Sequence, residues 1–233
     1  MSFAFAQRII GILFVVFVCN MQAKSLEDRL FQAIKDRDVK SVKTFADRGA
    51  YIKNDMVKAT LIYLLAVKKL PNYQQQKNAA QEIIKILVAH GAQPTVRDYI
   101  MAASENMVDL VRDWTYLPDG SFAFEAEVQD ALNAAAAYKA YDVARYLLDQ
   151  GVSPNAQGDS YPLEMAVVAY YGLQKPTKLE FIKFLLEHGA VVSARVQQEA
   201  QGIKWKYPEQ LRPGATREKV NALETLLAKY QNQ

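Results

Sequence analysis

Apolar residues recur every three or four positions over most of this 233-residue chain. That spacing puts them on one side of an α-helix, so it predicts amphipathic helices that pack through one face. We therefore expect an all-α fold with little regular sheet. The pattern and its breaks predict helices near residues 26–35, 39–47, 57–69, 78–89, 97–104, 107–114, 126–137, 141–149, 162–171, 178–188 and 217–230.

The start of the chain departs from this pattern. Arg8 precedes an apolar run over residues 9–19, and more polar residues then lead to the small Ala23. A basic residue, a short apolar run and a small residue after it are typical of a secretory signal peptide. The run is also shorter than the roughly 20 apolar residues of a bilayer-spanning helix. These features predict an exported protein.

The expected domain boundaries follow from cleavage after Ala23: a signal peptide over 1–23 and a folded domain over 24–233. A lipoprotein signal ending at Cys19 is the second interpretation, because the bulky Val-Phe-Val before it replaces the small residues that such signals favour. Cys19 is the single cysteine of the chain, so the mature protein would carry no thiol and no disulfide. We expect no stable membrane span after cleavage.

Four segments of the chain share one ending, in which a predicted helix finishes with two polar residues followed by glycine. A glycine just past a helix suits the left-handed conformation that often ends helices, because it has no Cβ to strain there. The repeated ending indicates a structural unit of two helices and a loop. The four glycines are Gly49, Gly91, Gly151 and Gly189.

These units resemble the ankyrin repeat. Residues 160–167 read SYPLEMAV, close to the G-x-T-P-L-H-x-A-A signature of that family, and residues 97–103 are a weaker copy. Tyr161 and Glu164 replace the threonine and histidine of the signature, which removes the side-chain hydrogen bonds that usually tie this turn together. Pro162 still suits the first turn of a helix, where its missing N–H costs nothing.

The period of the repeat supports the resemblance. Gly49 and Gly91 are 42 residues apart and Gly151 and Gly189 are 38 apart, compared with a period of about 33 in the ankyrin family. The excess lies between paired helices, in expected loops at 70–76 and 172–177. The resemblance covers about 25–233 as six units, which start near residues 26, 57, 97, 126, 160 and 193.

The resemblance implies an ankyrin-repeat solenoid of about six helix-turn-helix units with two enlarged inter-helix loops. It also implies a protein partner, bound on a concave surface formed by loop tips and the exposed ends of first helices. For the tyrosines, packing inside the fold is an equally weighted alternative. Carried over residue by residue, the expected partner-binding residues are Lys68, Lys69, Glu105, Tyr138, Tyr170 and Tyr171.

Composition and motifs limit the kinds of ligand and reaction that we expect for this chain. A net charge of +3 is too weak to indicate nucleic acid. His90 and His188 occupy equivalent places in two repeats, at helix ends where a protonatable side chain is favoured, so they do not indicate a metal or catalytic site. No metalloprotease, hydrolase, P-loop or dinucleotide motif occurs. We expect a non-enzyme without catalytic residues, metal, cofactor or small-molecule substrate.

The expected function is a periplasmic or secreted protein–protein interaction module, for which family analogy suggests an accessory or immunity-type role. The alternative is a secreted effector that binds a host protein. An aromatic and lysine-containing segment around Trp205 could meet nucleic acid or a headgroup surface. We expect Trp205 instead to fold back over the last repeat.

Overall fold

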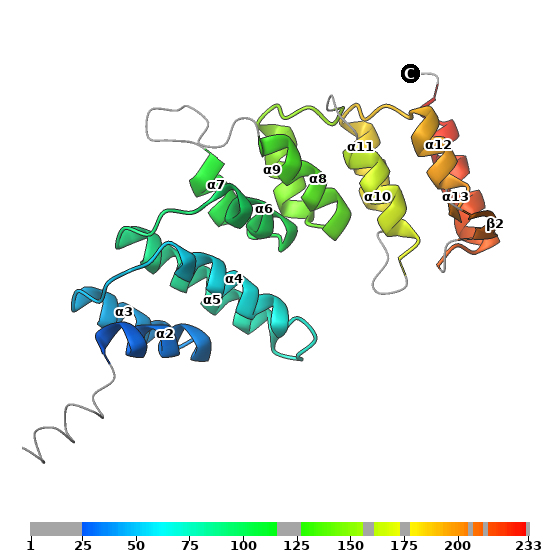
Figure 1. Cartoon of the computed structure of the whole chain (residues 1–233). Helices are drawn as coiled ribbons and strands as arrows, with labels where there is room; N and C mark the ends of the chain where they lie inside the picture. Colours follow the sequence, from blue (N-terminus) through cyan, green and yellow to red (C-terminus); the bar gives the residue numbers. More distant parts are fainter. Residues whose placement is uncertain are drawn as a thin grey trace, which may run out of the picture. The chain divides into compact units, whose positions relative to one another are not determined.

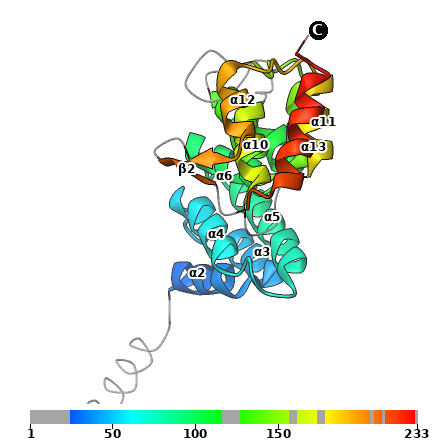
Figure 2. The ribbon, with the colours of Figure 1, turned by 90° about the vertical axis from the view of Figure 1, so that its right-hand side faces the viewer.

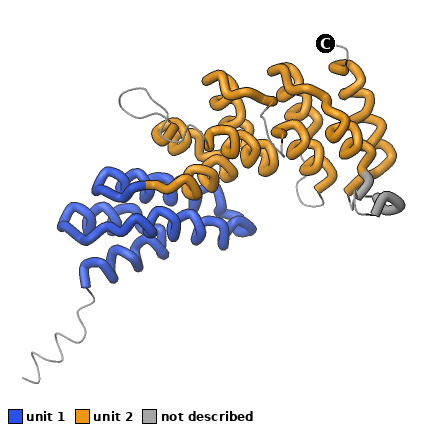
Figure 3. The backbone as a smooth tube through the Cα atoms, turned by 45° about the horizontal axis from the view of Figure 1, so that its top comes forward, with its two compact units in different colours: residues 1–93 blue, residues 94–233 orange. Residues whose placement is uncertain are grey.

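The computed structural model describes residues 25–115, 127–155, 161–172, 178–204, 207–211 and 214–231. The predicted signal peptide over 1–23 and Trp205 lie outside the described residues. The chain divides into two compact units, residues 1–93 and 94–233 (Figure 3). Both units are built from paired helices, which confirms the predicted all-α class (Figure 1).

Unit 1 contains two helix pairs. α2 packs against α3, and α4 packs against α5. The pairs are joined into one core because α3 also packs on α5 and α2 contacts α4. Leu30, Val42, Leu64 and Ile84 are completely buried in this core. The helices span Leu26–Asp36 (α2), Val39–Asp47 (α3), Asp55–Ala66 (α4) and Tyr73–Ala89 (α5).

Unit 2 continues the same alternation. The first helices α6, α8, α10 and α12 pack in series, and α7, α9 and α11 pair with the first three. A short antiparallel hairpin follows α12, and α13 closes the unit beside α12 (Figure 2). The elements are α6 (Val96–Ser104), α7 (Val108–Thr115), α8 (Val128–Tyr138), α9 (Tyr141–Asp149), α10 (Pro162–Tyr170), α11 (Leu179–Glu187), α12 (Ala194–Ala200), β1 (Ile203–Lys204), β2 (Tyr207–Leu211) and α13 (Arg217–Ala228).

The predicted glycine caps are confirmed. All four glycines follow a second helix with a φ between 82° and 101°, the left-handed region that a side chain would strain. Residues 25–28 read S-L-E-D, a pattern that predicts a capping box at a helix start, and the box is present in α2: Asp28 N–H donates to Ser25 Oγ at 3.0 Å, and Ser25 N–H donates back to the Asp28 carboxylate at 3.2 Å. Thr95 and Asp98 form a second capping box at α6, which was not predicted from the sequence.

Asparagines link consecutive repeats by the same kind of contact in both units. The side-chain oxygen of Asn54 accepts from the backbone N–H of Gln93 at 2.9 Å. Asn106 likewise accepts from Asp142 N–H at 2.9 Å. Asn155 accepts from Val191 N–H at 2.7 Å and donates to the carbonyl of Gly189. Each bond satisfies a backbone group that no helix can pair, so it fixes the spacing of neighbouring loops.

Three segments differ from the sequence prediction. The first enlarged loop is shorter than expected, because residues 73–76 form the first turn of α5 rather than loop. Ala194–Ala200 forms a helix that the periodicity did not identify. The two-stranded hairpin over 203–211 was not predicted either. The second enlarged loop lies mostly outside the described residues, since only Gly172 of 172–177 is described.

Candidate protein-binding surface

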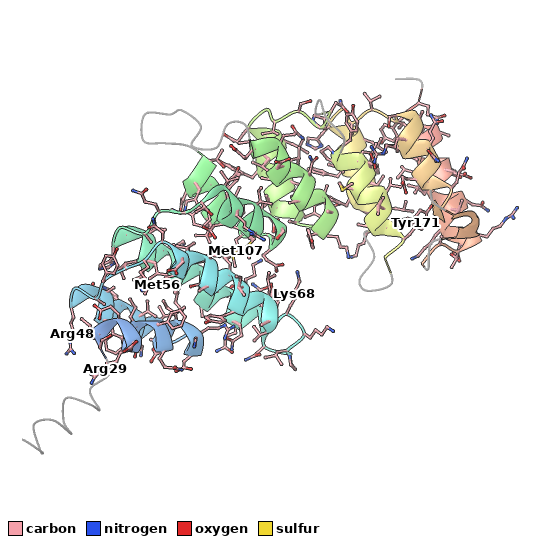
Figure 4. All side chains as sticks on the ribbon, viewed as in Figure 1. Arg29, Arg48, Met56, Lys68, Met107 and Tyr171 are labelled. Atoms are coloured by element: carbon pink, nitrogen blue, oxygen red, sulfur yellow. The ribbon has the colours of Figure 1, made fainter. Side chains whose placement is uncertain are left out.

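The six predicted partner-binding residues are divided between the two units. Lys68 and Lys69 belong to unit 1, and the other four belong to unit 2. Both lysines are exposed in the turn that follows α4. Figure 4 shows Lys68 at the C-terminal end of that helix. All six residues were expected to lie on one partner-binding surface, and this stays a prediction.

The lysines lie beside apolar side chains that the sequence reading did not select. Ile62 and Leu65 on α4 and Leu70 in the following turn keep 46%, 39% and 49% of their surface exposed. The sequence contains an indication of this exposure. Residues 61–67 are apolar without a break, whereas a helix that buries one face needs apolar residues only at every third or fourth position. A cluster of exposed aliphatic side chains is a common mark of an interaction surface.

Tyr170 and Tyr171 are buried, so the exposure predicted for them is wrong. Tyr170 retains 7% of its surface and Tyr171 retains 2%. Their rings meet edge to face with centroids 5.2 Å apart. The hydroxyl of Tyr171 donates to the carbonyl of Ala200 at the end of α12. Lys219 of α13 places its ammonium 5.5 Å from the Tyr170 ring. Tyr170 and Tyr171 therefore pack inside the fold, as the alternative interpretation of the sequence predicted.

The chain that follows α12 explains this burial. Gly214 lies against the Tyr171 backbone, where a Cβ would be 2.1 Å from the carbonyl oxygen, and Gly202 lies near the Tyr171 ring, where a Cβ would be in ordinary contact with Cζ at 3.6 Å. Both glycines flank the hairpin that interrupts the sixth unit. Burial also raises the pKa of the Tyr170 hydroxyl, with smaller contributions from Glu218 and Glu180.

Glu105 and Tyr138 end equivalent first helices but differ in exposure. Glu105 follows α6 as its C-cap residue and is buried, with 7% of its surface exposed, so it is not the exposed acid that the sequence predicted. Tyr138 is the last residue of α8 and keeps 61% of its surface exposed. Tyr138 is therefore the one predicted tyrosine that the structure presents to solvent in unit 2.

Glu164 replaces the histidine of the repeat signature and forms a different contact. Its carboxylate is buried at the start of α10 and accepts from Arg195 Nε of α12 at 2.9 Å. The guanidinium supplies the counter-charge that a buried carboxylate requires. Hydrogen bonding within the signature turn is thus replaced by an ion pair to the next first helix.

The two histidines have the same structural role. His90 and His188 are the C-cap residues of α5 and α11, and the Nδ1 of each donates to the carbonyl four residues earlier at 2.8 Å. In addition, His90 Nε2 lies 3.1 Å from an Asp47 carboxylate oxygen. Within the described ranges, no group of three or more His, Cys, Asp or Glu side chains could hold a metal ion.

Comparison with protein families identifies the repeat. The family model described as Ankyrin repeat matches residues 129–159, a stretch that includes most of α8, all of α9 and the Gly151 cap. The chain contains an ankyrin repeat. No curated protein and no solved structure matches it. The remaining helix pairs of both units follow the alternation seen in the matched repeat.

Ankyrin repeats are typically protein–protein interaction modules, and the repeat matched at residues 129–159 suggests that role for this chain. Its exposed apolar side chains are not confined to one repeat: besides the α4 group in unit 1, Tyr138 and Val191 are exposed in unit 2. Throughout the part of the chain that the structure describes, no helix has both the length and the apolar character needed to cross a bilayer.

Proposed function

We propose that this protein is exported and binds another protein in the periplasm or the secreted fraction, in an accessory or immunity-type role. The observation that carries the binding part is the match to the ankyrin repeat at residues 129–159. Export is supported by the basic residue, apolar run and small residue of the first 23 positions. Exposed apolar side chains on unit 1 support a partner of protein character.

The rigidity of the repeats suits this role. Capped helices, asparagine bridges and a continuous core hold the loops of each unit in place before a partner arrives. A preorganised surface loses little conformational entropy on binding, so more of the contact energy appears as affinity. Variation of exposed residues on such a scaffold changes the partner without changing the fold.

The test combines fractionation with partner capture. The full-length gene is expressed in a bacterium, and the protein is located in cytoplasmic, periplasmic and medium fractions. Mass spectrometry of the intact protein should give an N-terminus near Lys24. In-cell crosslinking followed by purification should then yield a protein partner that binds again when both components are purified.

A protein that keeps Met1 and stays in the cytoplasm would contradict export. Recovery mainly from the medium would favour the effector alternative over a periplasmic role. A chain that binds no protein after crosslinking in its own compartment would contradict the interaction role itself.

A further inference from the structure

Unit 1 exposes one face of α4 and the turn after it, here called the α4 surface and defined as Lys58, Ile62, Leu65, Lys69 and Leu70, of which only Lys69 was predicted to bind a partner. The first four are separated by four, three and four residues, so they form one stripe along the helix and its following turn. The opposite face carries the packing: Val57, Thr60, Leu61 and Leu64 are buried. The α4 surface is therefore not required by the core of unit 1.

The chain segment that carries this stripe is positively charged. Residues 56–81 contain four lysines, at 58, 68, 69 and 77, and no aspartate, glutamate or arginine. The acid on α4 is Asp55 at its first position, nearly three helical turns before Leu65. On the adjacent α2, the Asp36 carboxylate is already bonded by Gln32, whereas Lys35 adds a cation 6.0 Å from the Tyr63 ring.

We infer that the α4 surface docks an acidic amphipathic segment of the protein partner, with aliphatic side chains against Ile62, Leu65 and Leu70 and carboxylates facing Lys58 and Lys69. This inference rests on the proposed function, because it assumes that the partner is a protein. The aliphatic stripe would contribute affinity through burial. The lysines would contribute attraction at a distance, orientation and discrimination against basic partners.

Two other occupants fit the surface less well. A second copy of this chain would bring lysines against lysines, which is repulsive. A membrane would contact lysines and apolar residues together, but helices that lie in the membrane interface generally offer a broad apolar face with Trp or Phe. The α4 surface offers three aliphatic side chains and no aromatic one.

The probe for the test is a fluorescent synthetic helix with leucine at every third or fourth position and glutamate between. Its binding to the purified protein is measured by anisotropy at low and high salt. We expect Lys58→Glu with Lys69→Glu to weaken binding about tenfold or more, and Ile62→Ser with Leu65→Ser to weaken it by a similar factor. Raising the salt should weaken wild-type binding, because it screens the attraction.

Matched controls separate the site from net charge. Lys40 on α3 and Arg48 at its C-cap are exposed in unit 1, on a helix that packs against α2 and α5. Replacing both by glutamate makes the same change in net charge and should leave peptide binding within about twofold, as expected for charges away from an interface. A version of the peptide with lysine in place of glutamate should not bind. Circular dichroism checks that every variant keeps its helices.

Three results would overturn the inference. Equal loss of binding in the control pair would show a net-charge effect only. Stronger, α4-dependent binding to phosphatidylglycerol-containing vesicles than to the peptide would show a lipid surface. A captured protein partner that binds wild type and both α4 variants equally would reject the α4 surface while leaving the proposed function intact.

Discussion

Replacing Tyr171 tests the packing that hides it. Tyr171→Ala removes a ring with 2% of its surface exposed and the hydroxyl that bonds the Ala200 carbonyl. Aromatic-to-alanine changes in a core cost about 3–5 kcal/mol. Tyr171→Phe keeps the ring but leaves a buried carbonyl without this donor, a loss of about 1–3 kcal/mol. The Ala200 carbonyl belongs to the last turn of α12, where no later helical N–H pairs it.

The assay is urea unfolding followed by far-ultraviolet circular dichroism, with thermal melts as a second measure. We expect the midpoint to fall in the order wild type, Tyr171→Phe, Tyr171→Ala. Tyr138→Ala is the matched control, because Tyr138 is 61% exposed and its loss should change stability by about 0.5 kcal/mol or less.

Equal destabilisation by Tyr138→Ala and Tyr171→Ala would refute this reasoning. So would a Tyr171→Ala protein with unchanged stability and lost partner binding, since that pattern belongs to an exposed contact residue. Stability is read from the transition of unit 2, because repeat proteins can unfold in parts.

Two further predictions concern unit 2. Asn106→Gly should cost about 1–2 kcal/mol in urea unfolding, because it removes bonds to the N–H groups of Asp142 and Val143; Asn106→Ala should cost about 1 kcal/mol more, because φ is 56° at this position. Stability should also fall as pH rises above about 10. Burial raises the pKa of Tyr170 and of Tyr141 above the ordinary 10.0, so the unfolded chain releases these protons first and alkali favours unfolding. Tyr170→Phe should reduce that slope in alkaline melts, and an unchanged slope would contradict the role of Tyr170.

The features that the sequence predicted correctly depend on neighbours a few residues away. A glycine at position 151 ends α9 because its own backbone must adopt a left-handed conformation. Ser25 and Asp28 form a capping box because they lie three residues apart at a helix start. Periodicity located most helices for the same reason, since a helix brings together residues three and four apart.

The missed elements lack such local signals. The α12 helix has only seven residues, too few to show a clear period. Residues 73–76 read YQQQ, a polar stretch after a proline that suggests loop, yet they continue α5. Packing of α5 on α4 stabilises the helical conformation of this segment, which helix propensity alone would not do.

The sequence by itself determined that the chain is an all-α repeat and where its glycine-capped helices end. Only the tertiary structure decided which aromatic and apolar residues face solvent. Tyr171 and Tyr138 both lie at the end of a first helix, but the segment around Gly202 and Gly214 packs against Tyr171 and leaves Tyr138 exposed. The exposure of a side chain depends on whether a segment distant in the sequence packs over it, and the spacing of residues along the chain does not predict that packing.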